Sequence, residues 1–144
     1  MNGYLAVAVA AVFTWLGMVL AISFLEAPLK FRAPGITVQL GLGIGRLVFR
    51  ALNACEAVLA AVALGAALLG RGTAGAVAAL AVAVGVLAAQ LLGVRPALTR
   101  RSDAVLADAA VAESGRSRAH FVYVAFEAVK VMALVVAGVA LLGP

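Results

Sequence analysis

Three ionisable residues stand out in this sequence because each lies within a long apolar stretch. Glu56 lies in the second such stretch, and Glu127 and Lys130 lie in the last. A charged side chain near the centre of a bilayer costs at least about 2.5–3.5 kcal/mol on insertion scales, so it needs a partner or a function. Carboxylate and ammonium groups that meet there can form an ion pair, and a buried carboxylate can also carry a proton.

The spacing of the polar residues arranges them in two stripes. The last apolar stretch carries them at intervals of three, four and three residues, namely His120, Tyr123, Glu127 and Lys130. The second stretch carries them at intervals of four, three and three residues, namely Arg46, Arg50, Asn53 and Glu56. Side chains at these intervals share one face of a helix. The two stripes can satisfy each other if these helices pack together, so we expect Glu56 and Lys130 to meet.

Helix geometry also puts these charges at matching depths in the bilayer. Glu56 lies nine residues beyond Leu47, where the second stretch begins, and Lys130 lies nine residues beyond Phe121. With a rise of about 1.5 Å per residue, both lie about 14 Å from the same membrane edge, near the midplane. We therefore expect an intramembrane polar cluster composed of Glu56, Glu127, Lys130, Asn53 and Tyr123.

The polar residues nearer the membrane edge are expected to line the cytoplasmic mouth of this cluster. They are Glu26, Arg46, Arg50, Gln90, Arg95 and His120. Arg46 and Arg50 either set the topology or hold a lipid phosphate or an anionic substrate. His120 either has a structural role at the interface or responds to pH near neutrality, as histidines do.

Three interpretations of the intramembrane cluster are open. In the first, Glu56, Glu127 and Lys130 form a buried ion cluster that fixes the helix register, because polar groups join helices in lipid. In the second, they line a cavity open to the cytoplasm that holds a proton, an ion or a small ligand. In the third, these residues reach the interface by snorkelling or meet a partner chain. The sequence pattern is compatible with all three.

Other kinds of chemistry lack the residues they need. The chain has one cysteine, Cys55, and one histidine, so it cannot form a Cys/His metal cluster by itself. The glycine-rich run 41–46 lacks both the Gly-Lys-Ser/Thr of a P-loop and the spacing of a dinucleotide fingerprint. No combination of nucleophile, base and orienting group is visible, so we assign no catalytic residue, metal ligand or cofactor.

The composition requires a lipid environment for much of the chain. Of its 144 residues, 66% are hydrophobic and 12% are charged, against about 45–50% and about 25% in soluble domains. A bilayer core of about 30 Å needs about 20 apolar residues in a helix. Four stretches meet this requirement, 5–25, 47–69, 74–94 and 121–142. We predict a single all-α domain over residues 1–144, a four-helix transmembrane bundle.

The connections between the predicted spans differ in length. The second is only 70–73, which predicts a tight antiparallel hairpin. The first contains Pro28, Pro34 and Gly35, and its apolar run 36–44 is either an interfacial segment or a helical extension of the second span. The third connection, 95–120, is the longest and most polar, and 103–113 is predicted to form a short amphipathic helix.

The distribution of basic residues predicts an orientation. The first and third connections with their flanks hold nine Lys and Arg residues, whereas the opposite side holds only Arg71. Basic residues are enriched in cytoplasmic loops, so both termini are expected on the extracytoplasmic side. The Ala-, Gly- and Arg-rich composition is typical of a GC-rich bacterial genome, which predicts a multi-pass protein of the bacterial inner membrane.

A resemblance to a known family is carried by two runs, Ser23-Phe-Leu-Glu-Ala-Pro-Leu-Lys-Phe31 and Gly45-Arg-Leu-Val-Phe49. They resemble the exit of the first span and the entry of the second in small bacterial four-helix proteins related to transmembrane protein 205. The second half is similar through Arg95-Pro96, Arg101-Ser-Asp103 and His120. The resemblance implies the four-helix architecture and the signature positions Pro28, Phe31, Pro96 and His120. Glu26 and the Glu127/Lys130 pair depart from the family pattern, and the family's molecular function is largely unassigned.

Three classes of function are compatible with these residues. The leading hypothesis is a small transporter, channel or ligand-binding protein that uses the Glu56/Glu127/Lys130 cluster. The second is an accessory or scaffold subunit of a larger membrane complex. The third is a membrane enzyme acting on a lipophilic substrate, with His120, Tyr123 and Glu127 as acid/base candidates. The expected partners are the lipid bilayer, an anionic lipid or small ligand, and a second copy or larger complex, but not nucleic acid.

Overall fold

The computed structural model describes residues 1–108 and 118–143, except for the side chain of Ala119, and it contains no strand within them. In chain order, the helical segments are α1 (Gly3–Val19), η1 (Leu20–Glu26), α2 (Ala27–Leu29), η2 (Lys30–Arg32), α3 (Val38–Leu69), α4 (Ala74–Ala89), η3 (Gln90–Val94), α5 (Arg95–Ala107) and α6 (Arg118–Leu142). Of these, η1 and η3 are π-helical and η2 is a 3-10 helix.

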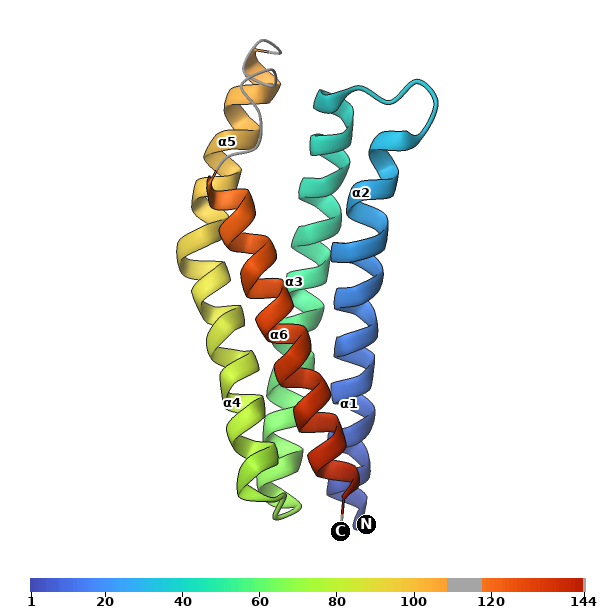
Figure 1. Ribbon diagram of the computed structural model, residues 1–144, viewed down its shortest axis with the longest axis vertical. Coiled ribbons are helices and arrows are strands. Elements are labelled where there is room, and N and C mark those ends of the chain that lie inside the picture. Colours follow the sequence, from blue (N-terminus) through green and yellow to red (C-terminus); the bar gives the residue numbers. More distant parts are fainter. Residues whose placement is uncertain (109–117, 144) are drawn as a thin grey trace.

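These segments join into long rods that run the length of the molecule (Figure 1). Within the described residues, four helices are long and apolar enough to cross a membrane, namely Gly3–Arg32, Val38–Leu69, Ala74–Ala107 and His120–Leu142. Each contains one of the spans predicted from the sequence. The predicted all-α bundle of four membrane-length helices is therefore confirmed, and it indicates a multi-pass membrane protein.

The four rods pack as a bundle in which each span contacts the spans next to it along the chain, and the last span also contacts the first. α1 packs against α3 and α6, and α4 packs against the same two helices from the opposite side. α3 and α6 consequently lie diagonally across the bundle (Figure 1). The expectation that the second and fourth spans pack directly needs correction, because their polar stripes meet across the bundle axis.

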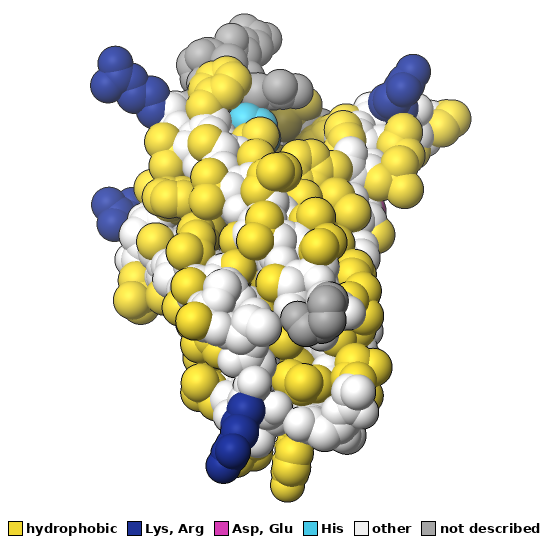
Figure 2. Space-filling view, turned by 60° about the horizontal axis from the view of Figure 1, so that its bottom comes forward, with side chains coloured by type: hydrophobic (Ala, Val, Ile, Leu, Met, Phe, Trp, Pro, Cys, Tyr) yellow, Lys and Arg dark blue, Asp and Glu magenta, His cyan; other side chains and the backbone are white. Residues whose placement is uncertain are grey.

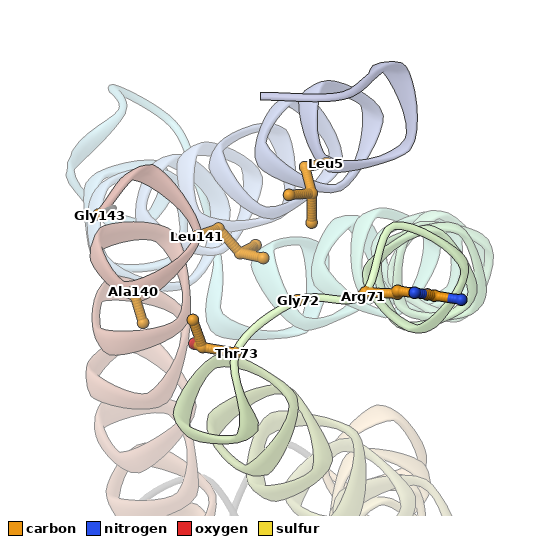
Figure 3. A pocket seen from close by; sticks show the side chains of 7 residues that line it. All are labelled: Leu5, Arg71, Gly72, Thr73, Ala140, Leu141 and Gly143. Carbon is orange, nitrogen blue, oxygen red and sulfur yellow. The ribbon is translucent and has the colours of Figure 1, made fainter.

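The two ends of the bundle differ. Both chain termini lie at one end, together with the turn between α3 and α4, and we call this the termini end (Figure 1). The connection from η2 to α3 lies at the other end, which we call the loop end. A shallow pocket of about 190 Å³ at the termini end is lined by Leu5, Arg71, Gly72, Thr73, Ala140, Leu141 and Gly143 (Figure 3).

The half of the bundle near the termini has a closely packed apolar centre. Its fully buried side chains are Ala8, Val12, Ala63, Ala67, Ala76, Leu80, Ala83, Leu134 and Ala137. Most of them are alanines, and small residues let helix backbones approach closely in lipid. The outer surface is also largely hydrophobic, with Lys and Arg side chains projecting at its edges (Figure 2). Such a surface suits contact with hydrocarbon rather than with water.

The connection between α3 and α4 is the tight turn that its length predicted. The N–H of Gly72 donates to the carbonyl of Ala67 at 2.7 Å, and the N–H of Arg71 donates to that of Leu68 at 3.2 Å. These two bonds form a Schellman cap, which requires a left-handed residue just after the C-cap. Arg71 occupies this position with a φ of 57°. The hairpin is therefore closed at the cost of placing a non-glycine residue in the left-handed region.

Two spans change helical geometry as they approach the loop end. α1 continues into η1 just before Pro28, and α4 continues into η3 just before Pro96. A proline removes a backbone donor, and its ring clashes with the carbonyl four residues earlier, so a wider π turn accommodates it within a continuous helix. Gln90 is the first residue of η3, and its side chain is buried in the bundle.

The loop-end segments differ in part from the predictions. Of the two alternatives for 36–44, helical extension is correct, because α3 begins at Val38 after Thr37, which accepts a capping hydrogen bond from the N–H of Leu40 at 3.1 Å. The short helix predicted over 103–113 begins earlier, since α5 starts at Arg95 and continues the third span to Ala107. Pro96 lies in the first turn of α5, where proline is tolerated. Residues 109–113 lie outside the described residues.

Candidate functional site

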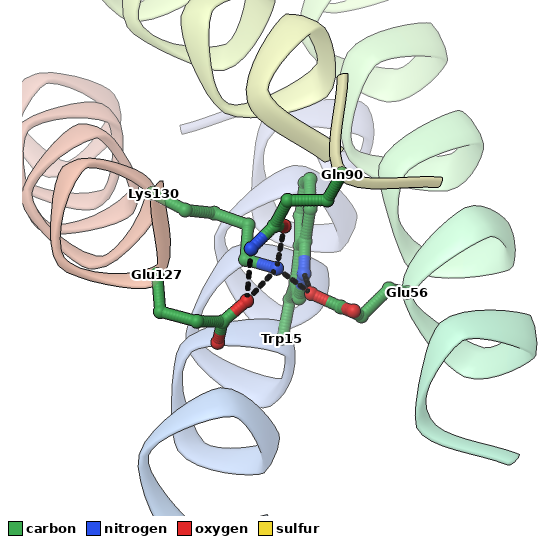
Figure 4. Close-up of polar contacts among 5 residues, drawn as sticks. All are labelled: Trp15, Glu56, Gln90, Glu127 and Lys130. Carbon is green, nitrogen blue, oxygen red and sulfur yellow. Dashed lines mark hydrogen bonds and ion pairs between the residues drawn. The ribbon is translucent and has the colours of Figure 1, made fainter. Parts of the chain in front are cut away.

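Lys130 lies at the centre of a buried polar cluster formed by all four spans (Figure 4). Its Nζ lies 2.5 Å from Oε1 of Glu56 and 2.7 Å from Oε1 of Glu127. The same nitrogen donates a hydrogen bond to Oε1 of Gln90 at 2.9 Å. An ammonium group carries three protons, so each of them has an acceptor.

Both carboxylates accept a further hydrogen bond within this cluster. Nε1 of Trp15 donates to Oε1 of Glu56 at 2.9 Å, and Nε2 of Gln90 donates to Oε1 of Glu127 at 2.7 Å. The exposed fraction is 0% for Glu56 and Lys130, 1% for Glu127 and 2% for Gln90. We call Trp15, Glu56, Gln90, Glu127 and Lys130 the charged cluster.

The charged cluster is asymmetric, because two carboxylates share one ammonium group. Oε2 of Glu127 is buried and has no hydrogen-bond partner among the described residues. Figure 4 shows this oxygen turned away from Lys130. A buried acceptor without a donor costs about 1–3 kcal/mol. A proton or a donor group that binds at this oxygen would therefore remove the cost of this unpaired acceptor.

The structure brings Glu56, Glu127 and Lys130 together, but it places other members of the predicted cluster elsewhere. Asn53 and Tyr123 lie about one helical turn nearer the loop end, whereas Gln90, predicted at the mouth, lies within the charged cluster. The direction of the side chains explains this difference. Cα–Cβ bonds tilt toward the N-terminus of a helix, so Gln90 leans toward the termini end and Lys130 leans toward the loop end.

Trp15 belongs to the charged cluster although the sequence reasoning missed it. It is the one tryptophan of the chain and lies in an apolar run, where its Nε1–H needs an acceptor. Counted from the termini end, Trp15 lies twelve residues from Gly3, and Glu56 lies thirteen residues from Leu69. The contact could have been predicted from the similar depths of the Trp15 N–H donor and the Glu56 carboxylate.

A cavity of about 770 Å³ lies between the charged cluster and the loop end. Among the residues that the structure describes, five cationic side chains line it, namely Lys30, Arg46, Arg50, Arg95 and Arg101. Among its described lining residues, Glu127 is the one carboxylate. We call this space the basic cavity. It includes Arg46, Arg50, Arg95 and His120 of the predicted mouth, whereas Glu26 and Gln90 are not part of its lining.

Aromatic rings form part of the wall of the basic cavity. The ring of Phe49 packs edge-to-face against Tyr123, with the centroids 5.7 Å apart. Nζ of Lys30 lies 5.6 Å from the centroid of Phe49, and the guanidinium carbon of Arg95 lies 5.7 Å from it. Cations over aromatic faces are stabilised by the ring quadrupole. The ring of Phe49 therefore stabilises two of the cationic groups that line the cavity.

Several of the cationic groups also have polar partners at the edge of the cavity. Lys30 pairs with Glu26 at 3.4 Å within the first span. Arg46 on α3 pairs with Asp103 on α5 at 2.6 Å.

The side-chain amide of Asn53 is a further polar partner, and it contacts Arg95. When the oxygen of its side-chain amide faces Arg95, it accepts hydrogen bonds from Nε at 3.1 Å and from Nη1. This orientation pairs every polar atom of that contact correctly, and amide orientation is assigned on this ground. Arg95 is thus held by a neutral group, which leaves its positive charge uncompensated at that contact.

Fold and site together define a class of protein, a helical membrane bundle with a charged cluster at its centre and a basic cavity on the loop side of that cluster. No family model matches the chain, and no curated protein or solved structure matches it either. Within the described residues, no three His, Cys, Asp or Glu side chains are grouped so that they could hold a metal ion. The chemistry of the site is therefore argued from its own geometry.

Proposed function

We propose that this protein binds a small anionic amphiphile in the basic cavity, as a ligand-binding protein or as a carrier. The observation that carries the proposal is the lining of the cavity, where five cationic side chains accompany aromatic and aliphatic ones. Guanidinium groups bind carboxylate, phosphate and similar oxyanions through paired hydrogen bonds. The apolar body of the ligand would lie against Phe31, Phe49 and Leu98, which line the same space.

The size and the closed inner end of the cavity support binding rather than an open channel. Its volume of about 770 Å³ lies within the range of about 300–1,000 Å³ that is usual for ligand pockets. On the termini side of the charged cluster, the bundle axis is filled by fully buried side chains such as Val12, Leu80 and Leu134. A ligand that enters the cavity would therefore stop at the charged cluster.

The alternatives have weaker support. His120, Tyr123 and Glu127 all line the basic cavity, which keeps them as acid/base candidates for a membrane enzyme. An accessory subunit would need no cavity of this size and charge.

In this proposal, both termini face the outside of a bacterial inner membrane and the basic cavity faces the cytoplasm. The support is the sequence asymmetry, in which nine Lys and Arg residues flank the loop-end connections and Arg71 lies at the termini end. Kinship with the transmembrane protein 205 family is part of the same proposal. It is supported by the short motifs around Pro28 and Pro96 in the segments that border the cavity.

The test is a calorimetric titration of the purified protein, in an uncharged detergent, with decanesulfonate. We expect decanesulfonate to bind, whereas decyltrimethylammonium, which carries the opposite charge on the same chain, should not. Methanesulfonate supplies the headgroup alone, so equally tight binding of methanesulfonate would identify a soluble anion as the ligand. Failure of both anions to bind would overturn the proposal.

A pair of variants on α5 tests whether the cavity is the binding site. Arg95→Gln removes a cationic group from the cavity lining and should weaken decanesulfonate binding about tenfold or more, since a hydrogen bond to a charged group contributes about 1.5–3 kcal/mol. Arg100→Gln is the matched control, because Arg100 is exposed on the same helix and is not part of the lining. Equal losses in the two variants would indicate unspecific charge attraction instead of a site.

A further inference from the structure

Beyond ligand binding, we infer that Glu127 is a proton-binding site, and that its carboxyl group takes up one proton when an anion enters the basic cavity. The first part depends only on the geometry of the charged cluster. The second part, the coupling to an anion, rests on the proposed function.

The charge balance of the cluster is the first step. If both carboxylates are ionised, Glu56, Glu127 and Lys130 together carry one negative charge in excess. Their side chains are at most 1% exposed, so water cannot solvate this charge. An uncompensated buried charge costs several kcal/mol, and buried groups neutralise when a proton is available. One proton on either carboxyl would balance the cluster.

The geometry selects Glu127 rather than Glu56 as the carrier. Glu127 lines the basic cavity, whereas Glu56 is not part of its lining. Oε2 of Glu127 has no partner among the described residues, so a proton can bind there without breaking a contact. Oε1 would continue to accept hydrogen bonds from Lys130 and Gln90. Because Glu127 lines the basic cavity, a proton that arrives through the cavity would form one O–H bond at Oε2 and would leave by the same route.

The charged and titratable groups around Glu127 act in opposite directions. The nearest such groups are Lys130 and Tyr123 on α6, Glu56 on α3 and Arg95 on α5. The polar neighbours are Gln90 of η3, Trp15 of α1 and Ser23 of η1. Further along the cavity lie Lys30, Arg46, Arg50, Arg101 and His120. Lys130 and Arg95 favour the ionised carboxylate, whereas Glu56 and burial favour the protonated form. The charges around Glu127 are thus of both signs, and an anion that enters the cavity changes their sum.

An anion in the basic cavity supplies that charge. It would pair with Arg95 and its cationic neighbours, and it would cancel the positive potential that stabilises ionised Glu127. Glu127 then takes up a proton, so the anion and the proton bind together without a change in net charge. By linkage, a site that gains one proton on binding gains affinity as the pH falls, by up to about tenfold per pH unit. Anion binding should therefore strengthen in acid.

The proton site itself is tested without a ligand, by infrared difference spectroscopy of the purified protein during a pH titration. We expect a carbonyl band of a protonated carboxylic acid that appears as the pH falls and is lost in Glu127→Gln. Glu26→Gln is the control, because Glu26 pairs with Lys30 at the cavity edge and should leave the band unchanged. Persistence of the band in Glu127→Gln would overturn the inference, whatever the ligand experiments give. If Glu127→Gln does not fold, Glu127→Asp should keep the acid but shift its band.

The coupling is tested by measuring proton uptake in weakly buffered detergent solution on addition of decanesulfonate, which does not itself titrate. We expect uptake of about one proton per bound anion in the wild-type protein. In Glu127→Gln, the uptake per bound anion should disappear, whereas His120→Gln, which removes the other lining group that titrates near neutrality, should keep it. Undiminished uptake in Glu127→Gln would refute the coupling. Absence of any decanesulfonate binding would instead refute the proposed function and with it the coupling, and the infrared titration would then decide the proton site alone.

Discussion

Lys130 is the residue on which the charged cluster depends, because two carboxylates and an amide share its ammonium group where water is excluded. Because two carboxylates share one ammonium group, substitution of Lys130 and substitution of a glutamate should change the stability of the protein by unequal amounts. Without Lys130, Glu56 and Glu127 would face each other as like charges. Without the charge of Glu56, a neutral pair of Lys130 and Glu127 would remain.

This asymmetry predicts a specific double-mutant cycle. Lys130→Met should destabilise the protein by about 3–5 kcal/mol, the usual cost of leaving a buried charge unpaired. Glu56→Gln alone should have a much smaller effect, and adding it to Lys130→Met should recover part of the loss. The measurement is the midpoint of unfolding by an ionic detergent in mixed micelles. Additive effects of the two substitutions would show that the side chains do not interact.

At the scale of single elements, backbone chemistry determines how the spans reach the site. Pro28 and Pro96 each follow a π-helical turn, so the first and third spans continue past the bilayer-length stretch instead of ending there. These extensions carry Lys30 and Arg95 into the lining of the basic cavity. At the other end, the Schellman cap at Arg71 closes the hairpin of α3 and α4. The cavity is therefore at the end where the helices are extended.

The left-handed conformation of Arg71 predicts that glycine would be preferred at this position. Arg71→Gly should stabilise the protein by about 1 kcal/mol. A side chain in the left-handed region costs about 1–2 kcal/mol, which glycine avoids, but part of this gain is lost because glycine increases the conformational entropy of the unfolded chain. Thermal unfolding in detergent measures the difference. Arg71→Ala is the control, since it removes the charge but keeps the Cβ atom, and it should give no gain. Equal stabilisation by both would assign the effect to charge.

At the scale of the whole molecule, the bundle is polarised along its axis. The termini half is filled by small apolar side chains, and the loop half encloses the basic cavity. Basic residues follow the same division, with Arg71 as the one such residue near the termini among those described. If the basic cavity binds a ligand as proposed, the orientation of the protein decides which compartment supplies that ligand.

The orientation can be measured by labelling single cysteines in a Cys55→Ser background. Gly143→Cys at the termini end should react with a membrane-impermeant maleimide on intact cells, since the basic connections are expected in the cytoplasm. Ala33→Cys at the loop end should react only after the membrane is permeabilised. The reverse pattern would place the basic cavity outside and would require an extracytoplasmic ligand.

Most of the fold follows from local features of the chain. Hydropathy predicts four spans, the length of 70–73 predicts a hairpin, and the spacing of Glu127 and Lys130 predicts that they share a helix face. The predicted bounds are too short at the loop end, because hydropathy ends where polar residues begin, although the helices continue through 27–32 and 95–107. Helix continuation through a proline depends on a π turn that no residue type specifies.

By itself, the sequence determined that the chain has membrane-length helices, that Glu56 and Lys130 lie at similar depth, and that basic residues gather at one end. Apolar length, helical period and charge count are properties of a single segment, so they can be read without knowing its neighbours. The tertiary structure decided that α3 and α6 face each other across the bundle, that Trp15 and Gln90 complete the charged cluster, and that Tyr123 lines the cavity instead. These contacts depend on the relative placement and side-chain direction of separate helices, which spacing along one helix cannot specify.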